Sequence, residues 1–328
     1  MINIGLNISN NEKKYDIFQT KIQKSLQSFS NLNYINVSNQ ASLKSRIHEL
    51  DILLTYSIKE EIFNLAKSKL QWIHFGSAGI EDSLFKSILS SKTILTNSSG
   101  IHANPVSEFV MGCILYHCKR FNECSDFKKN MEWNQWPIAK KMIQLKDQTI
   151  GIIGYGAIGK KIAQQAKQFN MRVIATKRLQ KKEISNKNVD RLLPLNNIEE
   201  LYRESDFIII SCPLTPKTEN LVSTKEIKIM KKNAFIINIA RGKIINDSAL
   251  IKALKNQDIA GAALDVFSHE PLPQNHPYFS LKNIFLSPHI SGNFPEYQSD
   301  MVTQFINNVT RFLKNKPLKN RICKKQLY

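Results

Sequence analysis

Short apolar segments alternate with amphipathic segments along the first hundred residues of the chain. The apolar segments predict buried strands at residues 2–8, 34–37, 51–55, 72–75 and 93–96. The segments between them carry apolar residues at helical spacing and predict helices at residues 14–29, 41–47, 59–66 and 80–89. Strands that alternate with helices form parallel sheets with helices on both faces, so we expect an α/β domain.

A second alternating block begins at Thr149. It predicts strands at residues 149–153, 172–175, 207–211, 234–239, 260–264 and 284–287, and helices at residues 157–169, 198–204, 224–230, 247–254 and 294–313. The last helix follows the end of this block, which makes it a candidate to return to the first domain. A chain of 328 residues is long enough for two domains that each bury a core.

The segment between the two blocks begins with a long apolar helix and continues with an irregular stretch. Pro105 suits the first turn of a helix over residues 105–120. Residues 122–146 show no clear periodicity and include Trp133 and Trp136. Two interpretations of this stretch stay open: an arm that packs on another subunit, or a surface loop with locally buried tryptophans.

Charge restricts the possible partners. The chain carries 46 basic and 27 acidic residues and a net charge of +19, but the basic residues are scattered as isolated pairs. Because no long basic run or aromatic-interleaved basic patch stands out, we expect a solvated basic surface and no nucleic-acid site. Such a surface still attracts small anions.

The apolar residues and the cysteines restrict the class of protein further. No uncharged apolar run reaches the ~18 residues of a membrane helix, and residues 1–8 lack the features of a secretion signal. We therefore expect a cytoplasmic protein with no membrane partner. The five cysteines form no Cys-x-x-Cys pair, which favours reduced thiols and no metal site.

The strongest local motif is a glycine-rich turn after the strand at residues 149–153. It reads Gly154-Tyr155-Gly156-Ala157-Ile158-Gly159. Between a strand and a helix, Gly154 permits the tight turn, Gly156 lets a pyrophosphate approach the backbone, and Gly159 lets the helix pack closely on the strand. The helix start offers unpaired N–H groups to phosphates, so this motif predicts a dinucleotide site.

The end of the next strand distinguishes between two dinucleotides. Sites for NAD normally place Asp or Glu about 20 residues after the turn, where the carboxylate binds the ribose 2′-hydroxyl. This chain has Lys177 and Arg178 there, and both would pair with a 2′-phosphate. We therefore predict a preference for NADP(H), with NAD(H) as the second cofactor. Two solvated surface cations are the alternative interpretation.

Four further motifs follow in the second block. They are Ser211-Cys212-Pro213-Leu214-Thr215-Pro216, Asn238-Ile239-Ala240-Arg241-Gly242, the segment from Gly261 to Leu272 with Asp265 and Glu270, and Ser287-Pro288-His289. In this order and at these separations, they resemble the D-isomer-specific 2-hydroxyacid dehydrogenase family. The resemblance runs from about Ser77 to the end of the sequence.

The resemblance implies that Arg241, Glu270 and His289 are catalytic. In that family a hydride moves between C4 of nicotinamide and C2 of a 2-oxo acid, and negative charge develops on the carbonyl oxygen. His289 would exchange a proton with this oxygen, while Glu270 would orient the imidazole and favour its charged form. Arg241 would bind the substrate carboxylate and polarise the carbonyl. Taken singly, each residue also has a purely structural interpretation.

The same resemblance implies further contacts. The cofactor would lie against Cys212, Pro213, Ile239, Ala240 and Asp265. The loop Gly76-Ser77-Ala78-Gly79 would hold the substrate carboxylate through its N–H groups, and Phe294 and Tyr297 are further candidates for the substrate pocket. Two departures from the family pattern stand near the cofactor motif: Lys177 replaces the usual Asp, and Asn170 stands where Gly is common. A non-glycine at Asn170 requires a modest backbone adjustment.

These observations predict the α/β fold class with two doubly wound parallel-sheet domains. Residues 1–99 and 290–328 would form a flavodoxin-like substrate domain, and residues 100–289 a Rossmann domain that binds the cofactor. We expect the active site in the cleft between them. The family usually dimerises through the cofactor domain, so we expect a homodimer with residues 105–146 in its interface.

The predicted function is the NADPH-dependent reduction of a small 2-oxo acid to the D-2-hydroxy acid, with glyoxylate or hydroxypyruvate as the first substrates to consider. Two alternatives stay open. One is an NAD-linked D-hydroxyacid dehydrogenase such as phosphoglycerate dehydrogenase. The other is a corepressor-like homologue that senses the dinucleotide and binds protein partners.

Overall fold

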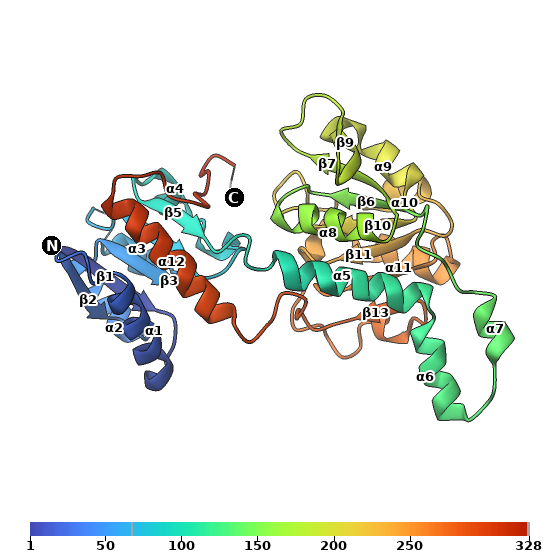
Figure 1. Cartoon of the computed structure of the whole chain (residues 1–328), viewed down its shortest axis with the longest axis horizontal. Coiled ribbons are helices and arrows are strands. Elements are labelled where there is room, and N and C mark those ends of the chain that lie inside the picture. The colour runs from blue at the N-terminus through green and yellow to red at the C-terminus, as the bar shows by residue number, and fades with distance from the viewer. Residues whose placement is uncertain (67, 327–328) are drawn as a thin grey trace. The chain divides into compact units, whose positions relative to one another are not determined.

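A computed structural model describes residues 1–66 and 68–326. The chain divides into two compact units (Figure 1). Unit 1 contains residues Met1–Ile101 and the chain from Phe294 onward, and unit 2 contains His102–Asn293. None of the helices in the described part of the chain is both long enough and apolar enough to cross a membrane.

Unit 1 is built around a sheet of five parallel strands. They are β1 (Ile2–Asn7), β2 (Leu32–Asn36), β3 (Ile52–Thr55), β4 (Trp72–Phe75) and β5 (Ile94–Asn97). Their order in the sheet is β2-β1-β3-β4-β5, which is the flavodoxin-like order. Every residue of β3 and of β4 is buried, as expected for central parallel strands that are covered on both faces.

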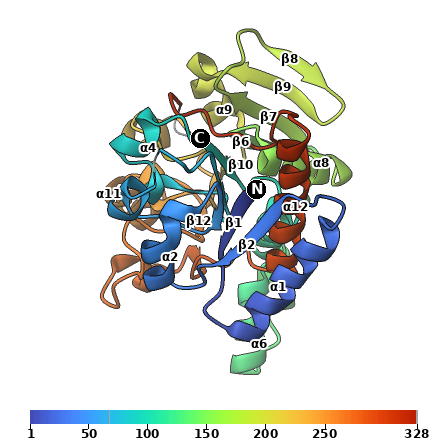
Figure 2. The ribbon, with the colours of Figure 1, turned by 90° about the vertical axis from the view of Figure 1, so that its left-hand side faces the viewer.

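Helices from both ends of the chain cover this sheet. On one face, α1 (Glu12–Ser25) lies beside α12 (Tyr297–Leu313) (Figure 2). The opposite core contains residues of α2 (Gln40–Arg46), α3 (Glu60–Asn64) and α4 (Lys86–Ser90). Single helical turns, η1 (Ile47–Glu49) and η2 (Glu81–Ser83), connect these elements. Phe305 of α12 stacks on Trp72 with ring centroids 5.4 Å apart, so the C-terminal helix completes the core of unit 1.

Unit 2 contains a larger sheet. Its strands are β6 (Thr149–Ile153), β7 (Arg172–Lys177), β8 (Ile184–Asn186), β9 (Val189–Pro194), β10 (Phe207–Ile210), β11 (Phe235–Asn238), β12 (Gly261–Leu264) and β13 (Ile284–Leu286). The order is β13-β12-β11-β10-β6-β7-β9-β8, and all neighbours are parallel except β8 and β9. This is a Rossmann sheet with one added strand at each edge, and it confirms the predicted fold class.

The helices of unit 2 form two buried cores on the two faces of this sheet. They are α5 (Ala103–Cys118), α8 (Ala157–Gln168), α9 (Ile198–Glu204), α10 (Thr224–Lys228) and α11 (Asp247–Asn256), with single turns η3 (Leu195–Asn197), η4 (Gly242–Ile244) and η5 (Pro277–Ser280). Helices α5 and α8 pack on each other. At the end of α8, Asn170 adopts φ 56°, a left-handed conformation that Asn tolerates better than most side chains.

The stretch after α5 differs from its prediction. It is not irregular throughout, because it contains α6 (Phe121–Asn130) and α7 (Gln135–Ala139). Both helices extend away from the body of unit 2 (Figure 1). Trp133 and Trp136 are 80% and 67% exposed, so the interpretation as a loop with buried tryptophans is wrong. Neither helix buries a residue, which explains why no apolar periodicity marks them in the sequence.

Candidate active site

The candidate site residues of unit 2 lie along the carboxyl edge of its sheet. In sheet order, the strand ends carry His289 after β13, Asp265 after β12, Arg241 after β11, Cys212 after β10, Gly154 after β6 and Lys177 at the end of β7. These strands are all parallel, so their carboxyl ends share one edge. The direction of strand order changes between β6 and β10. Open α/β sheets bind their ligands outside the carboxyl ends at such a point.

The glycine-rich turn leaves space for a ligand at one glycine and none at the other two. A Cβ atom on Gly154, whose φ is 105°, would lie 2.8 Å from the backbone N of Cys212. A Cβ atom on Gly159 would collide with the carbonyl oxygen of Gly154. A Cβ atom on Gly156, by contrast, would meet no described atom within 4 Å. Gly156 caps α8, so this space adjoins the unpaired N–H groups of a helix start and fits a pyrophosphate.

The residue before the two basic residues at the end of β7 is hydrogen-bonded to this turn. The carbonyl oxygen of Thr176 accepts hydrogen bonds from the N–H groups of Gly154 and Tyr155, at 3.2 and 2.9 Å. Lys177 and Arg178 follow immediately and are exposed. The turn and the two cations are therefore adjacent at the carboxyl ends of β6 and β7.

Glu270 and His289 are in direct contact. Nδ1 of His289 donates to Oε2 of Glu270 at 2.8 Å, and the N–H group of Phe267 donates to Oε1 of Glu270 at 2.9 Å. Burial raises the pKa of Glu270, but these hydrogen bonds and the charges of His289 and Arg241 outweigh it, so the pKa lies below its usual value. The ionised carboxylate fixes the ring through Nδ1, and Nε2 of a 51% exposed side chain can exchange a proton.

Arg241 lies near Glu270 and His289 because the loop after β11 packs closely on the loop that carries Glu270. A Cβ atom on Gly242 would collide with the backbone of Phe267, so only glycine lets the loop after β11 contact the loop that carries Glu270. Asn238 braces the same loop, because its side chain accepts from the N–H group of Ala240 at 3.1 Å and donates to the carbonyl oxygen of Arg241 at 3.0 Å. Arg241 is thereby held near enough to Glu270 to lower its pKa.

Asp265 holds the loop that carries His289. Its side chain is 1% exposed, and its carboxylate accepts from the hydroxyl of Ser287 at 2.6 Å and from the N–H groups of Ile290 and Ser291 at 2.9 Å each. His289 itself adopts a left-handed backbone with φ 54°. This conformation costs free energy for a non-glycine residue, and it persists only where neighbouring contacts offset that cost. Sequence reasoning assigned Asp265 a contact with nicotinamide and gave no signal for this network.

His102 also contacts this loop, although sequence reasoning assigned it no role. Its Nδ1 atom donates to the carbonyl oxygen of Gly292 at 3.0 Å. Burial lowers the pKa of His102, and the charges of Arg241 and His289 add to this effect against the opposing hydrogen bond to Gly292. These effects favour the neutral form of His102 beside Arg241 and His289.

The remaining predicted residues lie as follows. Cys212, Ile239 and Ala240 are buried and Pro213 is exposed. Burial raises the pKa of the Cys212 thiol to about 12, so it stays protonated. The predicted substrate loop belongs to unit 1, where Gly76 is buried and residues 77–79 are partly exposed after β4.

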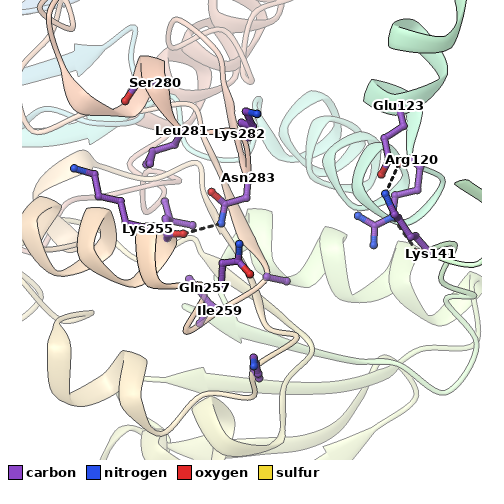
Figure 3. A pocket seen from close by; sticks show the side chains of 13 residues that line it. Arg120, Glu123, Lys141, Lys255, Gln257, Ile259, Ser280, Leu281, Lys282 and Asn283 are labelled. Atoms are coloured by element: carbon purple, nitrogen blue, oxygen red, sulfur yellow. Dashed lines mark hydrogen bonds and ion pairs between the residues drawn. The ribbon is translucent and has the colours of Figure 1, made fainter. Parts of the chain in front are cut away.

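A hollow of about 750 Å³ lies away from these residues, at the amino-terminal edge of the unit 2 sheet (Figure 3). It is lined by Arg120, Lys141, Lys232, Lys255 and Lys282, among others. Lys141 is paired with Glu123 at 2.8 Å. The ammonium group of Lys255 points away from Arg120 and Lys141 (Figure 3).

The chain is similar to known proteins in sequence and in fold. Residues 111–291 match the family model described as D-isomer specific 2-hydroxyacid dehydrogenase, NAD binding domain. A glyoxylate reductase of Thermococcus gammatolerans is 35% identical over 258 residues, which cover 76% of each chain. A D-isomer specific 2-hydroxyacid dehydrogenase family protein from Aeromonas salmonicida is 26% identical with a TM-score of 0.81, over 98% of this chain and 99% of that one.

The fold is also that of a solved enzyme with a bound dinucleotide. The NADPH-dependent glyoxylate/hydroxypyruvate reductase of Sinorhizobium meliloti, in complex with NADP and sulfate, matches all of both chains with a TM-score of 0.82 at 19% identity.

Proposed function

Because the chain belongs to the D-isomer specific 2-hydroxyacid dehydrogenase family, we propose that it uses NADPH to reduce glyoxylate or hydroxypyruvate to the D-2-hydroxy acid. The observation that carries this proposal is the contact of His289 with Glu270 beside Arg241, on the same sheet edge as the glycine-rich turn. The names of the relatives favour these two substrates over phosphoglycerate.

Residues of this chain would hold the cofactor along the carboxyl edge. Gly156 and the start of α8 would receive the pyrophosphate, and Lys177 with Arg178 would pair with the 2′-phosphate. The adenosine half would lie against Cys212 and Pro213, and the nicotinamide half near Ile239, Ala240 and Asp265. When bound, the reduced cofactor supplies the hydride.

Three side chains would act on the substrate. The protonated imidazole of His289 donates a proton from Nε2 to the carbonyl oxygen as negative charge develops there. Glu270 holds the ring through Nδ1 and stabilises its positive charge before that transfer. Arg241 would bind the substrate carboxylate and polarise the carbonyl. In unit 1, the N–H groups of loop 76–79 are the proposed substrate-binding groups.

The test is a screen of 2-oxo acids with NADPH and with NADH, followed by the absorbance of the reduced nicotinamide. We expect turnover of glyoxylate and hydroxypyruvate, faster with NADPH. His289→Ala should lower kcat about 10²- to 10⁴-fold while dinucleotide binding persists. His48→Ala, which changes an exposed histidine of unit 1, is the control. Absence of turnover across the panel, with dinucleotide still bound, would favour the dinucleotide-sensing alternative.

We also propose that the protein works as a homodimer in the cytoplasm, with α6 and α7 in the interface. These helices and the residues between them expose Phe121, Met131, Trp133 and Trp136. Apolar side chains so exposed are typical of a surface that a partner covers. Light scattering should give a dimer mass for the wild type and a monomer mass for a variant with both tryptophans changed to Ser. A monomeric wild type would refute the dimer.

A further inference from the structure

We infer that Tyr297 is a positioning residue for loop 76–79, and that its hydroxyl fixes the geometry in which the N–H groups of this loop receive a carboxylate. The inference rests on the proposed function, which assigns this loop to the substrate. It concerns contacts within unit 1 alone.

Every carbonyl oxygen from Phe75 to Gly79 accepts a hydrogen bond. Ser98 donates twice: its hydroxyl to the carbonyl of Phe75 at 3.0 Å and its N–H group to that of Ser77 at 3.1 Å. The hydroxyl of Tyr297 donates to the carbonyl of Gly76. The side-chain amide of Asn97 donates to Ala78 at 2.6 Å, and the hydroxyl of Ser77 donates to Gly79 at 2.8 Å. The peptide planes of the loop are therefore held through their oxygens, which leaves little freedom in the directions of their N–H groups.

The N–H groups of the same loop are used differently. That of Gly76 donates to the carbonyl oxygen of Thr55 at 2.8 Å. Those of Ser77, Ala78 and Gly79 find no acceptor among the described residues, and all three residues are partly exposed. Successive N–H groups with no protein acceptor form a binding place for an anion such as a carboxylate.

Tyr297 is the donor that comes from a distant element. It begins α12, 221 positions from Gly76, whereas the other donors lie in the loop or at the end of β5. Gly76 also contacts Tyr56, because a Cβ atom on Gly76 would lie 2.9 Å from the Tyr56 ring. Helix α12 thus reaches the start of the loop through a single hydroxyl.

The surroundings of Tyr297 keep this hydroxyl in place and protonated. The ring of Phe294 packs edge-on against that of Tyr297, with centroids 5.9 Å apart and an interplanar angle of 82°. Burial raises the pKa of Tyr297, and Tyr56 adds to this effect, so the hydroxyl remains a donor at every pH at which the enzyme would work. The carbonyl of Gly76 therefore has a permanent partner that orients the first peptide of the loop.

The test is Tyr297→Phe, which removes the hydroxyl and keeps the ring. Loss of one hydrogen bond should raise KM for glyoxylate about five- to tenfold, with kcat and the KM for NADPH changed less than twofold. Tyr15→Phe is the matched control, since it removes the hydroxyl of a buried tyrosine elsewhere in unit 1. Asn97→Ala, which frees the carbonyl of Ala78, should raise KM for glyoxylate in the same selective way.

Binding of oxamate, an unreactive analogue of a 2-oxo acid, separates this inference from the proposed function. In calorimetry with saturating NADPH, Tyr297→Phe should weaken oxamate about as much as it raises KM. If the wild type turns over glyoxylate but Tyr297→Phe matches it in both KM and oxamate affinity, the inference alone is wrong. If the wild type binds oxamate but turns over no 2-oxo acid, the proposed function is wrong, and weaker oxamate binding by Tyr297→Phe than by the wild type still supports the inference while equal binding contradicts it. A wild type that does neither overturns both.

Discussion

The carboxylate of Asp265 and the hydroxyl of Ser287 lie 2.6 Å apart in the interior of unit 2. Two backbone N–H groups, from Ile290 and Ser291, complete the set of donors around this carboxylate. A buried charge is tolerated only where hydrogen bonds replace its water, so Asp265 and the His289 loop fix each other. The strained backbone of His289 is the element that this arrangement holds in place.

Changing Asp265→Asn should therefore affect both stability and turnover. The amide presents an NH₂ group to at least one N–H donor, which leaves a buried donor unsatisfied and should cost about 1–3 kcal/mol in the free energy of unfolding. His289 would lose its fixed orientation, and kcat should fall at least tenfold. Urea unfolding and steady-state kinetics measure the two effects. Asp258→Asn, at an exposed position, is the control, and equal behaviour of the two variants would contradict the anchoring role.

The two glycines at the start of α8 should respond oppositely to alanine. At Gly156 the methyl group enters open space, so stability should change by less than about 0.5 kcal/mol, but a pyrophosphate would meet the methyl group and NADPH affinity should fall tenfold or more. At Gly159 the methyl group meets the carbonyl of Gly154, and overpacking should cost about 1–3 kcal/mol of stability. Unfolding curves measure the stability of each variant, and fluorescence titration measures its affinity for NADPH. A Gly159→Ala protein as stable as the wild type would refute the close packing.

Neutralising the cations after β7 should change cofactor choice. Replacing Lys177 and Arg178 with Gln removes charge-assisted hydrogen bonds to a 2′-phosphate, worth about 1.5–3 kcal/mol, so NADPH should bind about 10- to 150-fold more weakly. NADH lacks that phosphate, and its affinity should change less than twofold. Lys13→Gln with Lys14→Gln, an adjacent exposed pair in unit 1, controls for net charge. Equal losses for both cofactors would exclude a phosphate clamp.

The contact between Glu270 and His289 predicts a pH dependence. Because the pKa of Glu270 is lower in the folded protein than its ordinary 4.5, its ionised form stabilises the fold. This contribution to the free energy of unfolding is complete at pH values above the pKa that Glu270 has in the unfolded chain. It is lost as pH falls through the lower pKa that Glu270 has in the folded protein. The Tm difference between wild type and Glu270→Gln, compared with its value at about pH 6, should shrink as pH falls below about 4.5. A difference that grows in acid would contradict this assignment.

The same Glu270→Gln variant should lower kcat at neutral pH, because a neutral amide no longer stabilises the imidazolium. We expect a loss of about 10- to 100-fold with unchanged dinucleotide affinity.

The elements that sequence patterns predicted are those whose side chains enter a core. The β10 run of Phe207 and three isoleucines is buried throughout, and in β1 the side chains of Ile4 and Leu6 are buried; both strands are visible in the sequence as apolar segments. Strand β9 was missed although three of its residues are buried, because Asp190 and Arg191 interrupt its apolar residues. Strand β8 was missed because all three of its residues are exposed, so no apolar pattern marks it. Helices α6 and α7 were missed for the same reason.

The spacing of the sequence predicts the glycine-rich turn, because Gly154, Gly156 and Gly159 stand at positions that each require glycine for a stated reason. No pattern in the sequence signals contacts that join distant segments. The hydroxyl of Tyr297 at Gly76 and the ring of His102 at Gly292 span 221 and 190 positions. The left-handed backbone of His289 depends on such contacts too, since nothing in Pro288-His289 itself requires it.

The return of the chain to unit 1 has a consequence for synthesis on the ribosome. Phe305 completes the stack on Trp72, and Arg321 forms an isolated antiparallel β-bridge with Thr96 of β5, so unit 1 needs residues that are made after unit 2. Residues 102–293 contain both cores of unit 2 and emerge earlier. Unit 2 therefore has its full set of core residues before α12 is made, whereas Trp72 in unit 1 lacks its stacking partner Phe305 until then.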